Sequence, residues 1–299
     1  MSIEVSGLVK IYGEQKAVND ISFQVKKGEI VGFLGPNGAG KSTTIKIITG
    51  FLKSNSGNAT VCGIDVSENP IEAKRKIGYL PESNALYYDM YVKEYLQFIA
   101  GVHQISNYKL AVENVLQLTG LNVEEKKKIG QLSKGYKQRV GLAAALIHKP
   151  EVIILDEPTS GLDPNQLVEI RELIKKIGEE KTVILSTHIM QEVEAICDRI
   201  VIISKGKIVA NDKASILQNE TTHQTVYVEF DSKVSKSQLI KIPNIQKVEA
   251  VNNAWLIETS ADIDLRKEIS QFAQKEKWLI LTLKIEKKSL EEVFKDLTK

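Results

Sequence analysis

The sequence has 299 residues, which exceeds the usual size of one compact domain and leaves room for a large domain and a smaller one. Its 42% hydrophobic and 26% charged residues are typical of a globular protein rather than a disordered or fibrous one. The 40 basic and 38 acidic residues are spread along the chain and give a net charge of +2. This net charge is too small to attract nucleic acid electrostatically, so no nucleic-acid partner is expected.

The N-terminus and the longest apolar runs argue against export and membrane insertion. Residues 1–10 include Glu4 and Lys10 and lack the apolar core of a secretion signal. No apolar run approaches the roughly 20 residues that a membrane-spanning helix requires. Cys62 and Cys197 are too few and too far apart for a disulfide framework, so we expect reduced core residues in a cytosolic protein.

Strand-like and helix-like stretches alternate through the first two thirds of the chain, which is the pattern of a parallel sheet flanked by helices. The first clear strand is Glu29 to Leu34, and a helix from about Lys41 is expected to end near Gly50. Residues of about 88–147 have helical spacing and predict a helical subdomain inserted in a sheet domain of residues 1–219.

The turn between this first strand and helix satisfies the phosphate-loop pattern in the structural context that the pattern requires. Its residues are Gly35, Pro36, Asn37, Gly38, Ala39, Gly40, Lys41, Ser42 and Thr43. Glycines let backbone N–H groups turn toward phosphates, and the helix start adds its positive dipole end. We expect Lys41 to reach the β- and γ-phosphates of a nucleotide and Ser42 to ligate Mg²⁺.

Two carboxylates follow the apolar strand Val152 to Leu155. Asp156 and Glu157 therefore stand at the carboxyl edge of the predicted sheet. Carboxylates at a strand end are often only loop caps, but beside a phosphate loop a catalytic role is favoured. Asp156 is expected to hold Mg²⁺ through its water shell, and Glu157 to orient and polarise an attacking water.

Beyond Val209 the composition turns polar, and strand patterns restart after residue 222. The order strand, helix, strand, strand, helix, strand predicts a ferredoxin-like α+β domain of residues 222–299, with a hairpin turn at Asn252 and Asn253. Ser289 and Glu292 have capping-box spacing at the start of a terminal helix. No Gly-rich loop or cluster of ligands occurs in this part, so we expect a regulatory or dimer-stabilising role.

Residues 132–139, between the two nucleotide motifs, resemble the ABC signature that precedes a helix. With the phosphate loop and the carboxylate strand in this order, they identify residues of about 3–213 as similar to the ABC ATPase family. The resemblance implies a phosphate-loop NTPase fold, binding of ATP with Mg²⁺, and ATP hydrolysis. It also implies that Ser133 and Gly135 contact nucleotide, although Lys134 and Tyr136 depart from the residues that many members carry there.

The same resemblance implies roles for four further positions. Tyr12 matches the aromatic residue that stacks on adenine, although it could also be a core tyrosine. Asp163 ends the segment that crosses to the opposite subunit, and it could equally cap a helix that begins with Pro164. His188 matches the switch histidine near the γ-phosphate. Glu82 stands where the family usually has a glutamine, so it either approaches Mg²⁺ or points to solvent.

The family mechanism requires partners. One subunit cannot fold its signature onto its own phosphate loop, so the site is expected to be composite and completed by a second copy in a homodimer. A separate membrane-spanning permease is expected to dock on residues 82–95, whose aromatic side chains could otherwise be ordinary core. The protein would then lie on the inner face of the cell membrane, bound only through that permease.

The nearest subfamily resemblance is to ATP-binding subunits of ABC-2-type exporters associated with gliding motility. It rests on residues 78–82, the aromatic run 87–95, the signature and the C-terminal segment 290–294. Two alternatives remain. A non-transport ABC ATPase acting on ribosomes or DNA usually carries two cassettes or long coiled coils, and a scaffold without turnover would not need Glu157 and His188.

Overall fold

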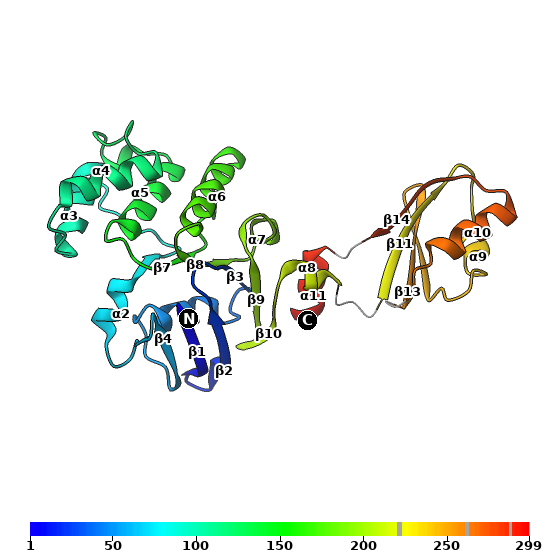
Figure 1. The fold of residues 1–299 in the computed structure, drawn as a ribbon, viewed down its shortest axis with the longest axis horizontal. Coiled ribbons are helices and arrows are strands. Elements are labelled where there is room, and N and C mark those ends of the chain that lie inside the picture. The colour runs from blue at the N-terminus through cyan, green and yellow to red at the C-terminus, as the bar shows by residue number, and fades with distance from the viewer. Residues whose placement is uncertain (220–222, 261–262, 287–288, 299) are drawn as a thin grey trace. The chain divides into compact units, whose positions relative to one another are not determined.

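The computed structural model describes residues 1–219, 223–260, 263–286 and 289–298 (Figure 1). The chain forms two compact units, Met1–Lys213 with the end of the chain from Leu297, and Ala214–Asp296. The sequence-based limits at residues 219 and 222 stay a prediction, because residues 220–222 lie outside the described part.

A six-stranded sheet in the order β10-β9-β3-β8-β7-β6 forms the centre of the first unit. Its strands are β3 (Ile30–Leu34), β6 (Ile77–Leu80), β7 (Val152–Asp156), β8 (Thr182–Thr187), β9 (Arg199–Ser204) and β10 (Lys207–Asp212). Neighbours from β9 to β6 are parallel, and β10 joins the edge antiparallel. Parallel neighbours need crossover segments, which helices supply here, so the predicted α/β class is confirmed.

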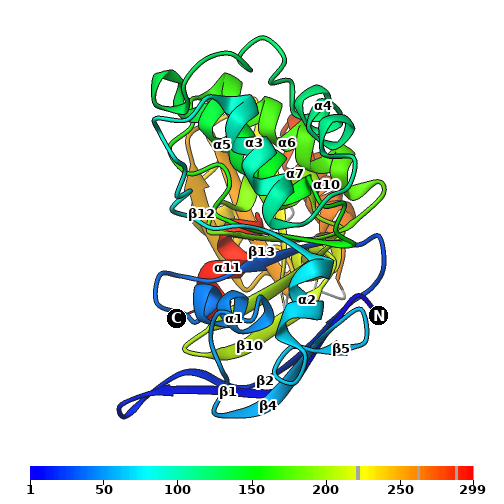
Figure 2. The same ribbon diagram turned by 90° about the vertical axis from the view of Figure 1, so that its left-hand side faces the viewer.

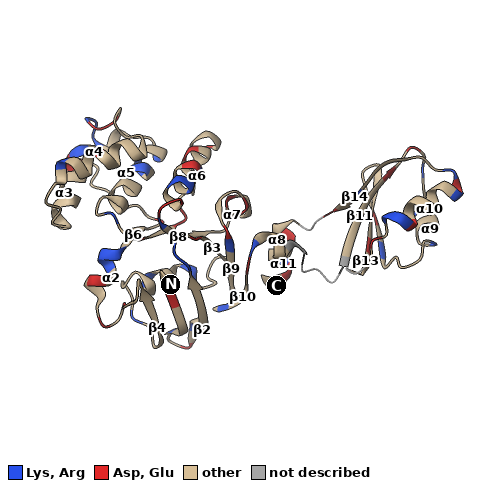
Figure 3. Ribbon diagram, viewed as in Figure 1, with Lys and Arg blue, Asp and Glu red and all other residues tan. Residues whose placement is uncertain are grey.

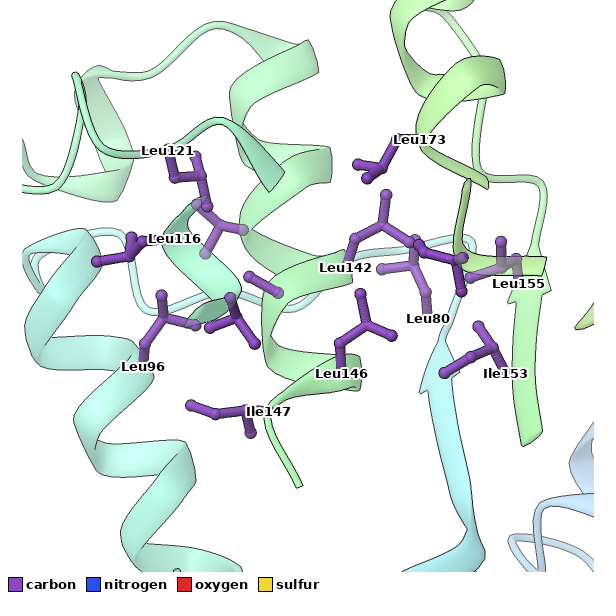
Figure 4. Packing of buried hydrophobic residues seen from close by; sticks show 14 of the residues in the cluster. Leu80, Leu96, Leu116, Leu121, Leu142, Leu146, Ile147, Ile153, Leu155 and Leu173 are labelled. Atoms are coloured by element: carbon purple, nitrogen blue, oxygen red, sulfur yellow. The ribbon is translucent and has the colours of Figure 1, made fainter. Parts of the chain in front are cut away.

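Seven α-helices belong to the described part of this unit. They are α1 (Lys41–Ile48), α2 (Pro70–Lys76), α3 (Val92–Val102), α4 (Tyr108–Thr119), α5 (Lys134–Leu146), α6 (Pro164–Gly178) and α7 (Met190–Ile196), with a 3₁₀ turn at Ile129–Gln131. Helices α3, α4 and α5 lie between β6 and β7 in sequence, in the region predicted as a helical subdomain. Their apolar side chains, such as Leu96, Leu116 and Leu146, pack into one cluster with Ile153 of β7 (Figure 4).

Alternate residues of β7 enter two different cores. Ile153 and Leu155 pack with the helical subdomain, whereas Val152 and Ile154 pack with α1 and a second sheet. That sheet is antiparallel, in the order β2-β1-β4-β5, and its strands are β1 (Ile3–Tyr12), β2 (Gln15–Val25), β4 (Ser56–Val61) and β5 (Ile64–Asp65). Figure 2 shows these strands and the helical subdomain at opposite ends of the unit. A strand buried on both faces is almost continuously apolar, which explains Val152 to Leu155 of β7.

The second unit contains a four-stranded antiparallel sheet in the order β12-β13-β11-β14. Its elements are α8 (Ala214–Asn219), β11 (His223–Phe230), α9 (Lys236–Leu239), β12 (Lys247–Val251), β13 (Ala254–Ser260), α10 (Arg266–Glu276), β14 (Ile280–Glu286) and α11 (Leu290–Thr298). This order and direction are those of a ferredoxin-like unit, as predicted. Ser289 and Glu292 form the predicted capping box, with backbone-to-side-chain bonds of 3.0 and 3.2 Å.

Both cysteines are free thiols, as expected. Burial raises the pKa of the Cys197 thiol, so this side chain behaves as an apolar core group. Lys and Arg, and Asp and Glu, are both scattered along the ribbon (Figure 3). No helix in the described ranges combines the length and the apolar character needed to cross a membrane.

Candidate functional site

The phosphate loop connects the end of β3 to the start of α1. A Cβ at Gly35 would collide with the carbonyl oxygen of Ile203, and one at Gly40 with that of Ala17. Gly40 also has a φ of 111°, a backbone conformation that is strained for residues other than glycine. Since Gly40 provides no capping side chain for α1, the first N–H groups of the helix stay available to an anion.

Lys41 holds its ammonium group across this loop. Its Nζ donates to the carbonyl oxygen of Gly35 at 2.7 Å and to that of Pro36 at 3.3 Å. Burial lowers the pKa of Lys41, and the nearby charges of Glu157, Asp156 and Glu82 raise it in turn. A lysine ammonium group beside the N-terminus of a helix can bind phosphate, because both carry positive charge.

Asp156 and Glu157 lie at the carboxyl edge of the sheet, as predicted. Asp156 is 3% exposed, and its Oδ1 has no hydrogen-bond partner in the described part of the chain. Glu157 leaves the strand in a left-handed conformation with φ 49°, while its N–H donates to the carbonyl oxygen of Ser186 at 2.9 Å. A positive φ at a non-glycine residue is uncommon and concentrates at functional sites.

Glu157 and His188 contact each other directly. His188 Nδ1 lies 2.9 Å from Oε1 and 2.8 Å from Oε2 of Glu157, and because a carboxylate only accepts, the imidazole donates. Burial raises the pKa of the Glu157 carboxyl, whereas the bond from His188 and the charge of Lys41 lower it. The pair resembles a general base oriented by a second polar group.

One cavity of about 410 Å³ collects most of the predicted residues. It is lined by Ala17, Asn37, Gly38, Gly40, Lys41, Ser42, Thr43, Glu82, Glu157, Ser160 and His188. Glu82 is exposed and lines this cavity, so both alternatives, an approach to Mg²⁺ and a position in solvent, stay open. Ala17, on β2, was not predicted, because nothing in a single sequence marks a small residue beside a phosphate loop.

Eight predicted residues do not line the cavity: Gly35, Pro36 and Ala39 of the phosphate loop, and Asp156, Tyr12, Ser133, Gly135 and Asp163. Tyr12 ends β1 with 49% of its surface exposed, so the core reading is wrong. Ser133 and Asp163 are N-caps: Ser133 accepts from the N–H of Tyr136 at 3.3 Å, and Asp163 accepts from two N–H groups of α6. Gly135 lies directly against Gln166 of α6.

The predicted metal ligands suit Mg²⁺ chemically. The described residues hold no group of three His, Cys, Asp or Glu side chains that could bind a metal alone. Ser42 and Glu82 nevertheless face the cavity, and the unpartnered Oδ1 of Asp156 is a buried acceptor. Mg²⁺ is usually held by one or two protein oxygens together with substrate phosphates and water, which matches this sparse set.

Sequence reasoning missed a buried carboxylate, Glu192, which is 0% exposed on α7. Thr159 and Thr187, also buried, donate their hydroxyls to it. The available signal was a glutamate between Met190 and Val193, on the apolar face of a short helix. Such a residue is almost never fully buried unless its oxygens are paired.

Comparisons with known proteins agree with this geometry. Residues 18–160 match the family described as ABC transporter. The linearmycin resistance ATP-binding protein LnrL of Bacillus subtilis is 36% identical, over 99% of this chain and 98% of its own length. The bacitracin transport ATP-binding protein BcrA of Bacillus licheniformis is 42% identical over 69% of this chain and 68% of its own.

Solved structures give the same result. One described as an ATP-binding subunit of an ABC transporter superposes with a TM-score of 0.67 at 31% identity, covering 74% of this chain and 93% of its own. The dimeric ATP-binding cassette MJ0796, bound to ADP and phosphate, gives 0.64 at 26% identity, covering 71% and 98%. The resemblance to gliding-motility exporters stays a prediction. The chain therefore belongs to the family of ABC transporter ATP-binding subunits, and it is an ATPase.

Proposed function

We propose that two copies of this chain close head to tail around ATP and that hydrolysis reopens them to drive export through a separate permease. The observation that carries the proposal is the division of the predicted site. Lys41, Glu157 and His188 share one cavity, whereas Ser133 and Gly135 do not line it. A second copy would bring its signature to that cavity, and the dimeric relative bound to ADP and phosphate supports this arrangement.

Each residue of the cavity has a distinct role in this proposal. Lys41 neutralises phosphate charge in the bound nucleotide, and Glu157 accepts a proton from the attacking water while His188 holds the carboxylate in place. Tyr12, exposed beside the hairpin, stacks on adenine. Ser42, Asp156 and Glu82 would hold Mg²⁺, which supplies further neutralisation of the phosphates.

The permease is proposed to dock on a groove of about 330 Å³ in the same unit. Phe51, Tyr79, Tyr95 and Ile99 contribute apolar surface to it, and Lys74 is the single Lys, Arg, Asp or Glu among the described lining residues. His103 and His148 stack in it with ring centroids 3.9 Å apart. Burial lowers the pKa of His148 to about 4, so its ring stays neutral near pH 7.

The aromatic run beside the groove divides between core and surface. Tyr95 is 7% exposed, but Tyr87, Tyr91 and Phe98 are 56%, 48% and 45% exposed. Exposed aromatic side chains next to an apolar groove favour docking of an amphipathic helix. A structural relative, cbiO1 of Clostridium perfringens, is described as part of the transporter complex cbiONQ, which supports a membrane-bound partner.

Export is the proposed direction of transport, since relatives are named for linearmycin resistance and for bacitracin transport. The subunit would then lie at the inner face of the membrane, attached through its permease. The transported compound would be selected by the permease, because the cavity described above is dedicated to nucleotide.

Substitutions at Glu157 and Lys41 test the composite site. Glu157→Gln should keep ATP bound, lower turnover about a hundredfold or more, and accumulate a closed dimer, because the amide cannot accept the water proton. Lys41→Ala should weaken ATP binding about tenfold or more, since one charged hydrogen bond contributes about 1.5–3 kcal/mol. Gel filtration with ATP, over a range of protein concentrations, measures the dimer.

Lys41→Ala serves as the control that separates nucleotide binding from closure. A Glu157→Gln protein that binds ATP but stays monomeric at every concentration would contradict the composite site. A Lys41→Ala protein with native ATP affinity would contradict the assignment of the cavity.

A further inference from the structure

Glu192 has no role in the mechanism described so far, although it is fully buried at 0% exposure. Its Oε1 accepts a hydrogen bond from Thr159 Oγ1. Its Oε2 accepts one from Thr187 Oγ1 at 2.8 Å. Thr187 Oγ1 in turn accepts from the N–H of Ile189 at 3.1 Å, which joins the first turn of α7 to the end of β8.

The two threonines belong to the two segments that carry the hydrolytic pair. Thr159 follows Glu157 by two residues, and Thr187 directly precedes His188. Chain connections and hydrogen bonds therefore form a closed ring. Thr159 and Thr187 both donate hydrogen bonds to Glu192. Along the chain Thr159 is joined to Glu157 and Thr187 to His188, and His188 donates to Glu157. Glu192 itself does not line the nucleotide cavity, so it touches the site only through these neighbours.

Loss of either hydrogen bond to Glu192 would cost free energy, and this cost stabilises the geometry of the ring. A buried carboxylate is costly unless its oxygens are hydrogen-bonded, so displacement of either threonine is penalised. His188, by contrast, has 53% of its side chain exposed and little packing to hold it. The position of the exposed His188 side chain therefore depends mainly on the backbone of its segment.

We infer that Glu192 is a positioning residue, which fixes the segments of Thr159 and Thr187 so that His188 meets the Glu157 carboxylate. This rests on the proposed function of the Glu157–His188 pair. Hydrolytic geometry must be held closely, because small misplacements of a general base lower the rate without preventing substrate binding. Glu192 therefore acts on the chemical step and not on the capture of ATP.

Steady-state kinetics of the full chain, with the variants Glu192→Ala and Glu192→Gln, tests this role. Glu192→Ala should lower kcat about tenfold or more and leave KM for ATP within about twofold, because only the chemical geometry changes. Glu192→Gln keeps the shape and one acceptor oxygen, so kcat should return to within about threefold of the native value. The double variant Glu192→Ala/His188→Ala should have the same kcat as His188→Ala alone, because the effects of two residues that act through one step are not additive.

Thr187 offers a matched pair that leaves Glu192 in place, which matters if Glu192→Ala does not fold. Thr187→Ser keeps the hydroxyl and should stay near native turnover, whereas Thr187→Val keeps the shape and should lose kcat as Glu192→Ala does. Native kcat in Glu192→Ala or Thr187→Val overturns the inference, as does an additive loss in the His188→Ala background. Native turnover in His188→Ala alone instead overturns the proposed pair, and the inference with it.

Discussion

Glu82 stands at the position where the family resemblance leads us to expect a glutamine. Its carboxylate lines the cavity that holds Lys41, and its charge raises the pKa of that lysine. Beside nucleotide phosphates a bare carboxylate would be repelled, and a direct oxygen contact to Mg²⁺ would offset the repulsion. Glu82 is therefore expected to approach the metal when ATP is bound.

Replacement of Glu82 tests the metal contact. Glu82→Gln should preserve turnover but raise the Mg²⁺ concentration needed for half-maximal activity, because the amide keeps an oxygen and loses the charge. Steady-state ATPase and ATP binding, each measured across a Mg²⁺ titration, report on the change, with Glu82→Ala as the variant that removes the oxygen. Unchanged Mg²⁺ profiles for both variants would refute the metal role.

At the scale of single residues, sequence motifs identified the candidate residues of the site, but the geometry of the site could not be predicted from them. Lys41, Asp156 and Glu157 were found because their spacing and neighbours in sequence match a required chemistry. The left-handed φ of Glu157 and the burial of Glu192 were not predictable, since both depend on how β7 and β8 lie side by side. Only the folded sheet brings Thr159 and Thr187 to one carboxylate.

Among the elements, helices α3 and α5, the loop after β6 and the turn after α1 contribute to the surface proposed for the permease. Phe51→Ala and Tyr87→Ala should each lower co-purification of the permease several-fold, because exposed aromatic side chains dominate the energy of such interfaces. Both residues are more than half exposed, at 68% and 56%, so stability should change little. Quantitative mass spectrometry of affinity-purified membranes measures the effect.

Tyr108→Ala provides the matched control: Tyr108 is an exposed aromatic residue, at 40%, outside the aromatic run 87–95, whereas the Tyr87 ring lies 6.0 Å from that of the groove residue Tyr95. ATP binding by all three variants should stay native. Equal recovery of the permease with Phe51→Ala, Tyr87→Ala and Tyr108→Ala would exclude this groove as the docking site.

Element types were predictable where apolar periodicity was strong, but some boundaries were not. The start of the last strand, at Ile280, is an example. Lys277 ends α10 in a left-handed conformation, and the Trp278 N–H donates to the Ala273 carbonyl oxygen at 2.8 Å. This helix-ending turn usually contains glycine, so a lysine at this position does not predict the end of the helix.

For the whole molecule, the nucleotide cavity depends on the first unit alone. All the residues that line it lie between Ala17 and His188, within Met1–Lys213. Truncation after Lys213 should therefore leave a folded protein that binds ATP with native affinity. Circular dichroism and ATP-binding titration measure the outcome, and Lys41→Ala in the truncated chain is the control.

A truncated chain that folds but fails to bind ATP would show that the second unit completes the nucleotide site. If binding is native but the ATP-dependent dimer weakens, the ferredoxin-like unit stabilises the dimer, as proposed from its lack of ligand-binding motifs. The sequence located this unit through its strand order, but nothing in one chain specifies which surface of a second copy it would meet.

The close packing of the signature against its own subunit has a consequence for how two sites would work together. Gly135 lies against Gln166, and Gly161 lies against Lys134, so the signature touches the segment that follows Glu157 in the same chain. In a head-to-tail dimer the segment that begins at Glu157 would connect the site of its own subunit with the signature, which serves the nucleotide of the other subunit. Hydrolysis at one site would then change the position of the signature at the other, so the two sites are expected to be energetically coupled rather than independent.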